Sequence, residues 1–283
     1  MDIFRHIQVV EREGELLARA AAEAGSDAKV PTCPDWQVRD LLKHTGMVHR
    51  WAAAFIRERR MAYRLGGELP DLDGNGLVEW FREGHAALVE TLRAAPPDVQ
   101  CWAFLPAPSP LAFWARRQAN ETTIHRVDAE SARGGQLSLI DAEFAVDGIE
   151  ELLLGLHARK KSRVRSAVPR VLRVRATDVP GASGASGPPG PSGASDASVS
   201  SDASVSSDAS VSSGSSGERI WTVRLSDGPP VTERGATAAA DGEVSGPAAR
   251  LYPALWNRLP FPQVTGDPTL AELWREKSPI VMS

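Results

Sequence analysis

The chain has 283 residues, of which 42% are hydrophobic and 24% charged, and its formal net charge is −4. This is the composition of a globular protein long enough for two modest domains. The sequence has no basic block of the kind that follows phosphates and no apolar run approaching about 18 residues, which argues against nucleic acid and membrane as partners. The N-terminus lacks the apolar core of a signal peptide, so we expect a cytoplasmic protein. We also expect a monomer.

Residues 1–160 are predicted to be helical. Apolar residues at helical spacing indicate a first helix that ends near Gly25. After the breaker-rich stretch VPTCPDW, a second helix is expected, with Asp35 or Gln37 near its N-cap and Asp40 in its first turn. Further helices are expected over LVEWFREGHAALVETLRAA, over about 110–133, and over the shorter DAEFAVDGIEELLLGLHARK. Four long helices joined by short loops are typical of a bundle.

After residue 165 the hydrophobic period changes to that of strands. RVLRVRAT and ERIWTVRLSDG alternate and are rich in β-branched residues, and ATAAAD is predicted as a further strand. Helices are expected over GPAARLYPALWNRL and from Pro268 to about Glu276. The predicted fold class is therefore α+β, with a helical bundle over 1–160 and a small α/β domain over 166–283.

A low-complexity segment interrupts the second domain. The hexapeptide SDASVS occurs three times, starting at Ser195, Ser201 and Ser207. Each copy offers one valine and no aromatic residue, too little apolar surface to offset the entropy of ordering. We predict a disordered insertion at about 180–217 within a hairpin loop, with a glycosylated stalk as the alternative for such a serine-rich tract.

Polar residues occupy the apolar face of two predicted helices. On the second helix the three-four spacing joins one imidazole to four core residues: Leu41, His44, Val48, Trp51 and Phe55. On the fourth helix it aligns Trp114, Gln118, Glu121, His125 and Asp128. Glu121 and His125 are four residues apart, so their side chains share one helical face. If this face points inward, burying Glu121 as an unpaired carboxylate would destabilise the fold by roughly several kcal/mol. A divalent metal shared with His44 and His125 would remove that cost.

Two simpler interpretations remain open for these residues. A Glu and a His four residues apart usually form a solvated pair, and a single histidine in an apolar seam is usually a hydrogen-bonded core residue. The other histidines, His6, His49, His85 and His157, are not expected to join a site. Cys33 and Cys101 are isolated thiols that form neither a disulfide framework nor a metal motif, and we interpret both as buried apolar residues away from the site.

Three stretches carry a resemblance to a known family. VPTCPDWQVRDLLKHTGMVHRWAA, FWARRQANETTIHRVDAE and FAVDGIEELL resemble the mycothiol-dependent maleylpyruvate isomerase family, and VSGPAARLYPALWNRL resembles its C-terminal domain more weakly. The resemblance implies a DinB-like metal-binding four-helix bundle followed by a small domain like that of sterol carrier proteins. It also implies that His44, Glu121 and His125 are metal ligands. The family pattern differs at Asp35, Gln37 and Asn120, where glycine, a hydroxyl residue and histidine are usual.

The resemblance implies a chemistry that depends on an external thiol. Three protein ligands leave a coordination position open, as in catalytic sites, and the two histidines and one glutamate suit Zn²⁺ first among divalent metals. A thiol bound there, mycothiol in this family, would be held as its nucleophilic thiolate. Its addition to a small electrophile followed by rotation and expulsion would give cis–trans isomerisation, and its retention would give S-transfer.

Two other functions remain open at this stage. One is a metal hydrolase, in which hydroxide takes the open position, and the other is a binding protein without activity. An anionic substrate would need a cation near the metal, and Arg258 is the candidate catalytic residue for that role. Arg50 and Arg126 are as readily interpreted as surface residues.

Overall fold

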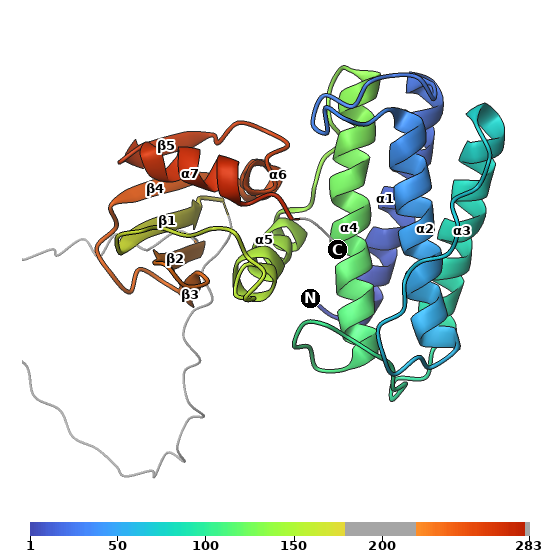
Figure 1. The fold of residues 1–283 in the computed structure, drawn as a ribbon, viewed down its shortest axis with the longest axis horizontal. Helices are drawn as coiled ribbons and strands as arrows, with labels where there is room; N and C mark the ends of the chain where they lie inside the picture. Colours follow the sequence, from blue (N-terminus) through green and yellow to red (C-terminus); the bar gives the residue numbers. More distant parts are fainter. Residues whose placement is uncertain (179–218, 281–283) are drawn as a thin grey trace, which may run out of the picture.

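The computed structural model of this protein describes residues 1–178 and 219–280. The predicted insertion at about 180–217 lies outside the described residues, so its prediction is not tested. Within the described part the fold is α+β, as predicted, with a helical region followed by a five-stranded sheet and its helices. Figure 1 shows the two parts side by side, the helical region at the right and the sheet at the left.

Four long helices form the first part: α1 (Ile3–Ala24), α2 (Val38–Arg57), α3 (Gly74–Ala94) and α4 (Pro110–Arg133). They stand alongside one another in Figure 1, as the prediction of a bundle requires. α1 ends at Gly25 and α4 at Gly134, and both glycines have a positive φ that residues with side chains rarely adopt.

Local hydrogen bonds fix the start of α2. Gln37 is the N-cap of the helix, and its backbone N–H donates to the Asp40 carboxylate at 2.9 Å. The Gln37 side-chain amide donates to the Asp27 carbonyl, also at 2.9 Å. Of the two predicted caps, Gln37 is therefore the N-cap. The Asp40 carboxylate in the first turn also interacts favourably with the positive end of the helix dipole.

α4 is buried on nearly all sides along Leu111–Glu130, although many of its residues are polar. It packs against α1 and α2 within the bundle, and the chain that follows the bundle covers its remaining face. One such contact comes from Tyr252, whose hydroxyl donates to the Asn120 side-chain oxygen at 2.8 Å. Gly148 lies where a Cβ would meet the Tyr252 ring at 2.4 Å, so only glycine permits this close approach. The inward face of α4 is thus only part of its buried surface.

A short helix continues into a wider turn after the bundle. α5 (Ala142–Glu150) passes directly into the π-helical segment η1 (Glu151–Leu156), where the sequence pattern predicts one continuous helix. π-helical turns are rare and often occur near functional sites. Here the turn begins at Glu151, whose side chain contacts the polar cluster on α4 described below.

The sheet has the order β3-β2-β1-β4-β5, with β1 and β4 parallel and all other neighbours antiparallel. Its strands are β1 (Arg170–Ala176), β2 (Arg219–Leu225), β3 (Val231–Arg234), β4 (Gly242–Gly246) and β5 (Gln263–Gly266). The alternating residues of β1 and β2 that the sequence pattern assigned to strands are confirmed. Leu172, Val174 and Val223 point to the buried face.

The predicted strand over ATAAAD is wrong. Residues 236–241 form the connection between β3 and β4, and the strands lie on either side of them. Alanine packs little surface on a pleated sheet, whereas the flanking segments bring Val231 and Val244 to it. Backbone pairing to β1 then selects β4, whose Val244 lies opposite Val174.

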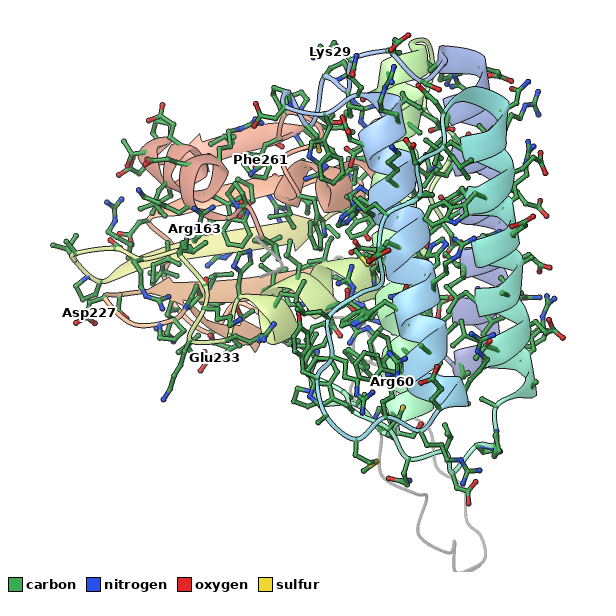
Figure 2. The ribbon with its side chains drawn as sticks, turned by 45° about the vertical axis from the view of Figure 1, so that its right-hand side comes forward. Lys29, Arg60, Arg163, Asp227, Glu233 and Phe261 are labelled. Carbon is green, nitrogen blue, oxygen red and sulfur yellow. The ribbon has the colours of Figure 1, made fainter. Side chains whose placement is uncertain are left out.

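α6 (Ala248–Leu255) and α7 (Thr269–Lys277) complete the sheet region. Buried residues of the sheet and of α6 belong to the same apolar cluster as residues of α4 and α5. Figure 2 shows side chains filling the space between the sheet and the bundle, with Phe261 labelled on the sheet side. One core therefore joins the two parts. Among the described residues, no helix combines the length and the apolarity needed to cross a membrane.

His157 is expected to make the fold sensitive to acid. Its Nδ1 lies 3.1 Å from the Ser162 hydroxyl, its ring packs edge-on against Trp274, and burial lowers its pKa to about 4. The unfolded chain therefore takes up a proton near pH 6.5 and the folded chain only near pH 4. The free energy of unfolding should fall by about 3 kcal/mol between these values because of this residue alone.

The measurement is the difference in free energy of unfolding between the wild type and His157→Gln, from urea titrations at several pH values. We expect this difference to shrink by about 3 kcal/mol as the pH is lowered from 7 to 4. A difference that stays constant over this range would contradict the assignment.

Candidate metal centre

The structure brings together the three side chains predicted as ligands. His44 comes from α2, and Glu121 and His125 come from consecutive turns of α4. Oε1 of Glu121 lies 3.3 Å from Nε2 of His44 and 3.3 Å from Nε2 of His125. One ligand atom from each residue falls within 4.8 Å of the others. Within the described chain, this is a group whose donor atoms could hold a metal ion.

Burial differs across the three side chains. The side chains of Glu121 and His125 are 10% and 9% exposed, whereas that of His44 is 27% exposed. Trp36, from the loop before α2, covers part of the group, with its ring centroid 4.9 Å from the His44 ring and 5.9 Å from the His125 ring. The group is therefore open to a small molecule mainly beside His44.

Asp128 orients His125 from the next turn of α4. Its Oδ2 lies 2.9 Å from Nδ1 of His125. A carboxylate accepts hydrogen bonds, so the imidazole carries a proton on Nδ1 and directs Nε2 toward Glu121 and His44. Burial alone would lower the pKa of His125, but the hydrogen bonds and charges of Asp128 and Glu121 raise it to about 9.

Asp128 is itself held from three sides. Arg258, which follows α6, donates from Nε to Oδ1 at 2.9 Å and from Nη2 to Oδ2 at 3.0 Å. The Thr32 hydroxyl donates to Oδ1 at 2.6 Å. Burial opposes ionisation of Asp128, but the charges of Arg258 and His125 hold its pKa well below the usual value. The carboxylate stays ionised, which fixes both its partners.

Arg117 plays a similar part for Glu121. Its Nη2 donates to Oε2 of Glu121 at 3.1 Å, and its Nη1 contacts Glu151 at the start of η1. Burial would raise the pKa of Glu121, but hydrogen bonds with His125 and His44 and the charges of His125 and Arg117 lower it well below its usual value. With Oε2 taken by Arg117, Oε1 is the oxygen that faces the two histidines.

The sequence interpretation placed Asp128 on the same helical face but gave neither it nor the other supporting residues a role. Arg117 stands four residues before Glu121 on the same face of α4, and that spacing alone indicates an ion pair. Asp128 stands three residues after His125 and could have been assigned in the same way. Trp36 and Thr32 come from an irregular loop, so no periodic pattern in the sequence places them beside the group.

Arg258 lies near the group but is already paired. Its bidentate contact with Asp128 leaves its side chain 17% exposed. The predicted catalytic role for Arg258 stays a prediction, and its observed contact is with the carboxylate that orients His125. The interpretation of Arg126 as a surface residue is wrong, because its side chain is fully buried between Glu13 and Glu130. Arg50 is partly buried and lies over the Trp80 ring at 3.8 Å.

Cys33 is closer to the group than the sequence interpretation placed it. Its Sγ is 3.4 Å from Nη2 of Arg258 and 3.7 Å from Oδ2 of Asp128. The loop that carries it folds back against α4, which its distance along the chain from His44 does not reveal. Burial and the Asp128 charge raise the pKa of the Cys33 thiol to about 11. Cys33 is therefore a neutral thiol that contacts the supporting residues and not the three central ones.

The remaining histidines do not join the three, as predicted. His49, one turn along α2, is fully buried and contacts the Thr122 hydroxyl at 2.9 Å. His6 pairs with Asp147 at 3.0 Å. Asn120, where histidine is usual in the resembling family, faces Tyr252 and not the three central residues. Its difference from the family pattern thus affects the contact between the bundle and α6.

A cavity of about 360 Å³ adjoins the exposed side of His44. Its lining also includes Trp51 of α2 and Arg159 from the segment after η1. A larger cavity of about 440 Å³ includes His85 and shares no residue with the three central side chains. The smaller cavity is therefore the one that connects with the candidate metal centre, and its volume suits a small molecule.

The fold and this group define a helical bundle with a three-ligand candidate metal centre, joined to a small mixed sheet. Residues 8–130 match the family model described as the mycothiol maleylpyruvate isomerase N-terminal domain. Residues 8–130 are therefore similar to this family, and the predicted resemblance is confirmed for that part of the chain. Comparisons with the curated proteins and with the solved structures gave no match.

Proposed function

We propose that this protein is a metal- and mycothiol-dependent enzyme that acts on a small electrophile by cis–trans isomerisation or S-transfer. In this proposal His44, Glu121 and His125 hold a divalent metal, Zn²⁺ first. The observation that carries it is the convergence of their ligand atoms within 4.8 Å beside a cavity. The match of residues 8–130 to the mycothiol maleylpyruvate isomerase N-terminal domain supports the choice of thiol.

The donor set fits such a metal. Zinc bonds to nitrogen and oxygen are about 2.0–2.2 Å long, so two ligands of one ion lie at most about 4.4 Å apart. The observed 3.3 Å separations of Glu121 Oε1 from both histidine nitrogens fall within this limit. The 4.8 Å that bounds all three ligand atoms exceeds it slightly, so the two histidines would move a little closer together around an ion. The supporting residues match as well, because metal-bound histidines usually donate their second N–H to a carboxylate, as His125 does to Asp128.

In this proposal the residues around the metal bind, orient or shield the reacting groups. A divalent metal with three protein ligands leaves a position for an external ligand and lowers the pKa of a thiol placed there. Asp128 and Arg117 hold His125 and Glu121 in their orientations. Trp36 limits access of water from one side, and the cavity beside His44 would take the electrophile.

The properties of the two cysteines support an external source of the reactive sulfur. The raised pKa of Cys33, about 11, keeps it as a thiol, and its contacts are with Asp128 and Arg258. Cys101 is buried in the apolar core, and burial raises its pKa too. Neither thiol therefore resembles a reactive cysteine, which needs a lowered pKa and exposure.

The decisive experiment is metal analysis of the purified protein, followed by assays of the metal-loaded form with a panel of small electrophiles. We expect about one divalent ion per chain and turnover that requires added mycothiol. A hydrolase would turn over without thiol and be inhibited by it, because the thiol would displace hydroxide. A binding protein would hold the metal without turnover. A monomeric state and a cytoplasmic location stay predictions.

A further inference from the structure

Aromatic rings form one part of the wall of the cavity beside His44. Four rings contribute to it, from Trp51, Tyr63, Trp102 and Phe104. Trp102 lies edge-on to Trp51 with centroids 6.1 Å apart and to Tyr63 with centroids 5.5 Å apart. The Trp51 indole donates to the Arg64 carbonyl at 2.6 Å, which fixes that ring, and the backbone N–H of Trp102 donates to the Arg60 carbonyl at 2.7 Å. Figure 2 labels Arg60, the acceptor of the Trp102 N–H, near the lower end of the bundle.

Among the described residues, two basic side chains also line the cavity and no acidic one does. Arg159 and Lys161 both come from the segment between η1 and β1. Within the described part of the chain, Arg159 forms no ion pair, and its guanidinium lies over the Phe104 ring at 5.1 Å from the centroid. A chain with net charge −4 thus presents a positive lining at this cavity. Such a lining favours an anionic occupant.

We propose that this cavity binds an amphipathic monoanion, with its one carboxylate at Arg159 and an aromatic or apolar body against the rings. The inference rests on the proposed function in one respect: the occupant would be the electrophile, with its reacting end toward His44. A planar unsaturated body suits aromatic walls, because offset and edge-to-face ring contacts add to the apolar area that is buried.

The lining disfavours the two obvious alternatives. A small dicarboxylate could place one charge at Arg159, but its second charge would lie among the rings, and burying an unpaired carboxylate is costly. A polar, sugar-based thiol such as mycothiol would leave most of its hydroxyl groups without partners against the same rings. Arg159 and the rings together therefore select a substrate that is apolar at one end and anionic at the other.

Binding of three probes to the full metal-loaded chain, measured by isothermal titration calorimetry without thiol, tests this inference. trans-Cinnamate is an unsaturated aromatic monoanion, cinnamamide is its neutral counterpart, and fumarate is a dianion without the ring. We expect cinnamate to bind at least about tenfold more tightly than either of the others, because it alone has both the ring and the single charge.

Matched variants test which lining residues contact the carboxylate of the probe and which contact its ring. Arg159→Gln should weaken cinnamate about tenfold and leave cinnamamide unchanged, and Arg159→Lys should restore part of the loss. Lys160→Gln is the control, because it removes the same charge from the adjacent exposed residue, which does not line the cavity. Tyr63→Ala should weaken cinnamate and cinnamamide equally, and its half-exposed side chain makes loss of folding a small concern.

The outcomes separate this inference from the proposed function. Tighter binding of fumarate than of cinnamate, or cinnamate binding that Arg159→Gln leaves unchanged, would overturn the inference whatever the activity. Cinnamate binding with the expected variant pattern, in a protein that shows no thiol-dependent turnover, would uphold the inference and reject the proposed function.

Discussion

Replacing His44 with alanine is expected to abolish thiol-dependent turnover and to lower metal affinity together. His44 supplies one of three ligand atoms and is the only one from α2. Removing one of three ligands weakens a metal site strongly, and among the described residues no further His, Cys, Asp or Glu belongs to the group. The measurements are the metal content after dialysis, the dissociation constant from a chelator competition, and turnover with saturating mycothiol.

Two further variants serve as references for the loss of metal affinity in His44→Ala. Asp128→Asn keeps all three ligands but weakens the acceptor that orients His125, so metal affinity should fall about 10- to 100-fold. Cys101→Ser is the control, because Cys101 belongs to the apolar core and touches none of the three ligands. Retention of full metal affinity in His44→Ala would show that the three side chains form a polar core cluster and not a metal site.

The substitution Arg126→Met is expected to reduce the free energy of unfolding by about 3–5 kcal/mol. Arg126 is fully buried and donates to Glu13 at 2.7 Å and to Glu130 at 2.7 Å. Without it, the Glu13 carboxylate keeps only the more exposed Arg12, and Glu130 keeps Ser138. This loss of stability arises because the substitution leaves buried carboxylates unpaired. The net stabilisation that the ion pairs contribute is smaller. Urea titration followed by circular dichroism measures it.

Arg12→Gln is the matched control for this prediction. Arg12 also donates to Glu13, but its side chain is 52% exposed, so we expect a loss of less than about 1 kcal/mol. A triple variant that replaces Arg126, Glu13 and Glu130 with apolar residues of similar size should be less destabilised than Arg126→Met. Equal losses in the Arg12 and Arg126 variants would contradict the role of buried charge.

The long helices could be predicted from the sequence because apolar residues repeat over many turns. The ends of α1 and α4 follow from Gly25 and Gly134, which permit the required backbone conformation. The three central residues of the site were also predictable, since Glu121 and His125 share a helical face and His44 lies in an apolar seam. Their use as metal ligands came from the family resemblance and remains a proposal.

The surroundings of the site could not be predicted, because they depend on contacts between distant segments. Arg258 reaches Asp128 across 130 positions of sequence, and Cys33 approaches both from an irregular loop. Short strands also escaped prediction, because pairing with a neighbouring strand selects them more than their own residues do. β5, for example, is exposed along its length and carries no alternating apolar pattern.

The pairing of Arg258 with Asp128 makes the state of His125 inseparable from the docking of the segment after α6. Arg258 can donate its two hydrogen bonds to Asp128 only while that segment lies against α4. These bonds fix the Asp128 carboxylate, which in turn orients His125. Linkage is reciprocal: whatever binds more tightly to His125 in this orientation must strengthen the docking by the same free energy. Ligand binding beside His125 and docking of the segment after α6 thus belong to one thermodynamic cycle. A substitution that weakens the docking should weaken the binding, and the reverse also holds.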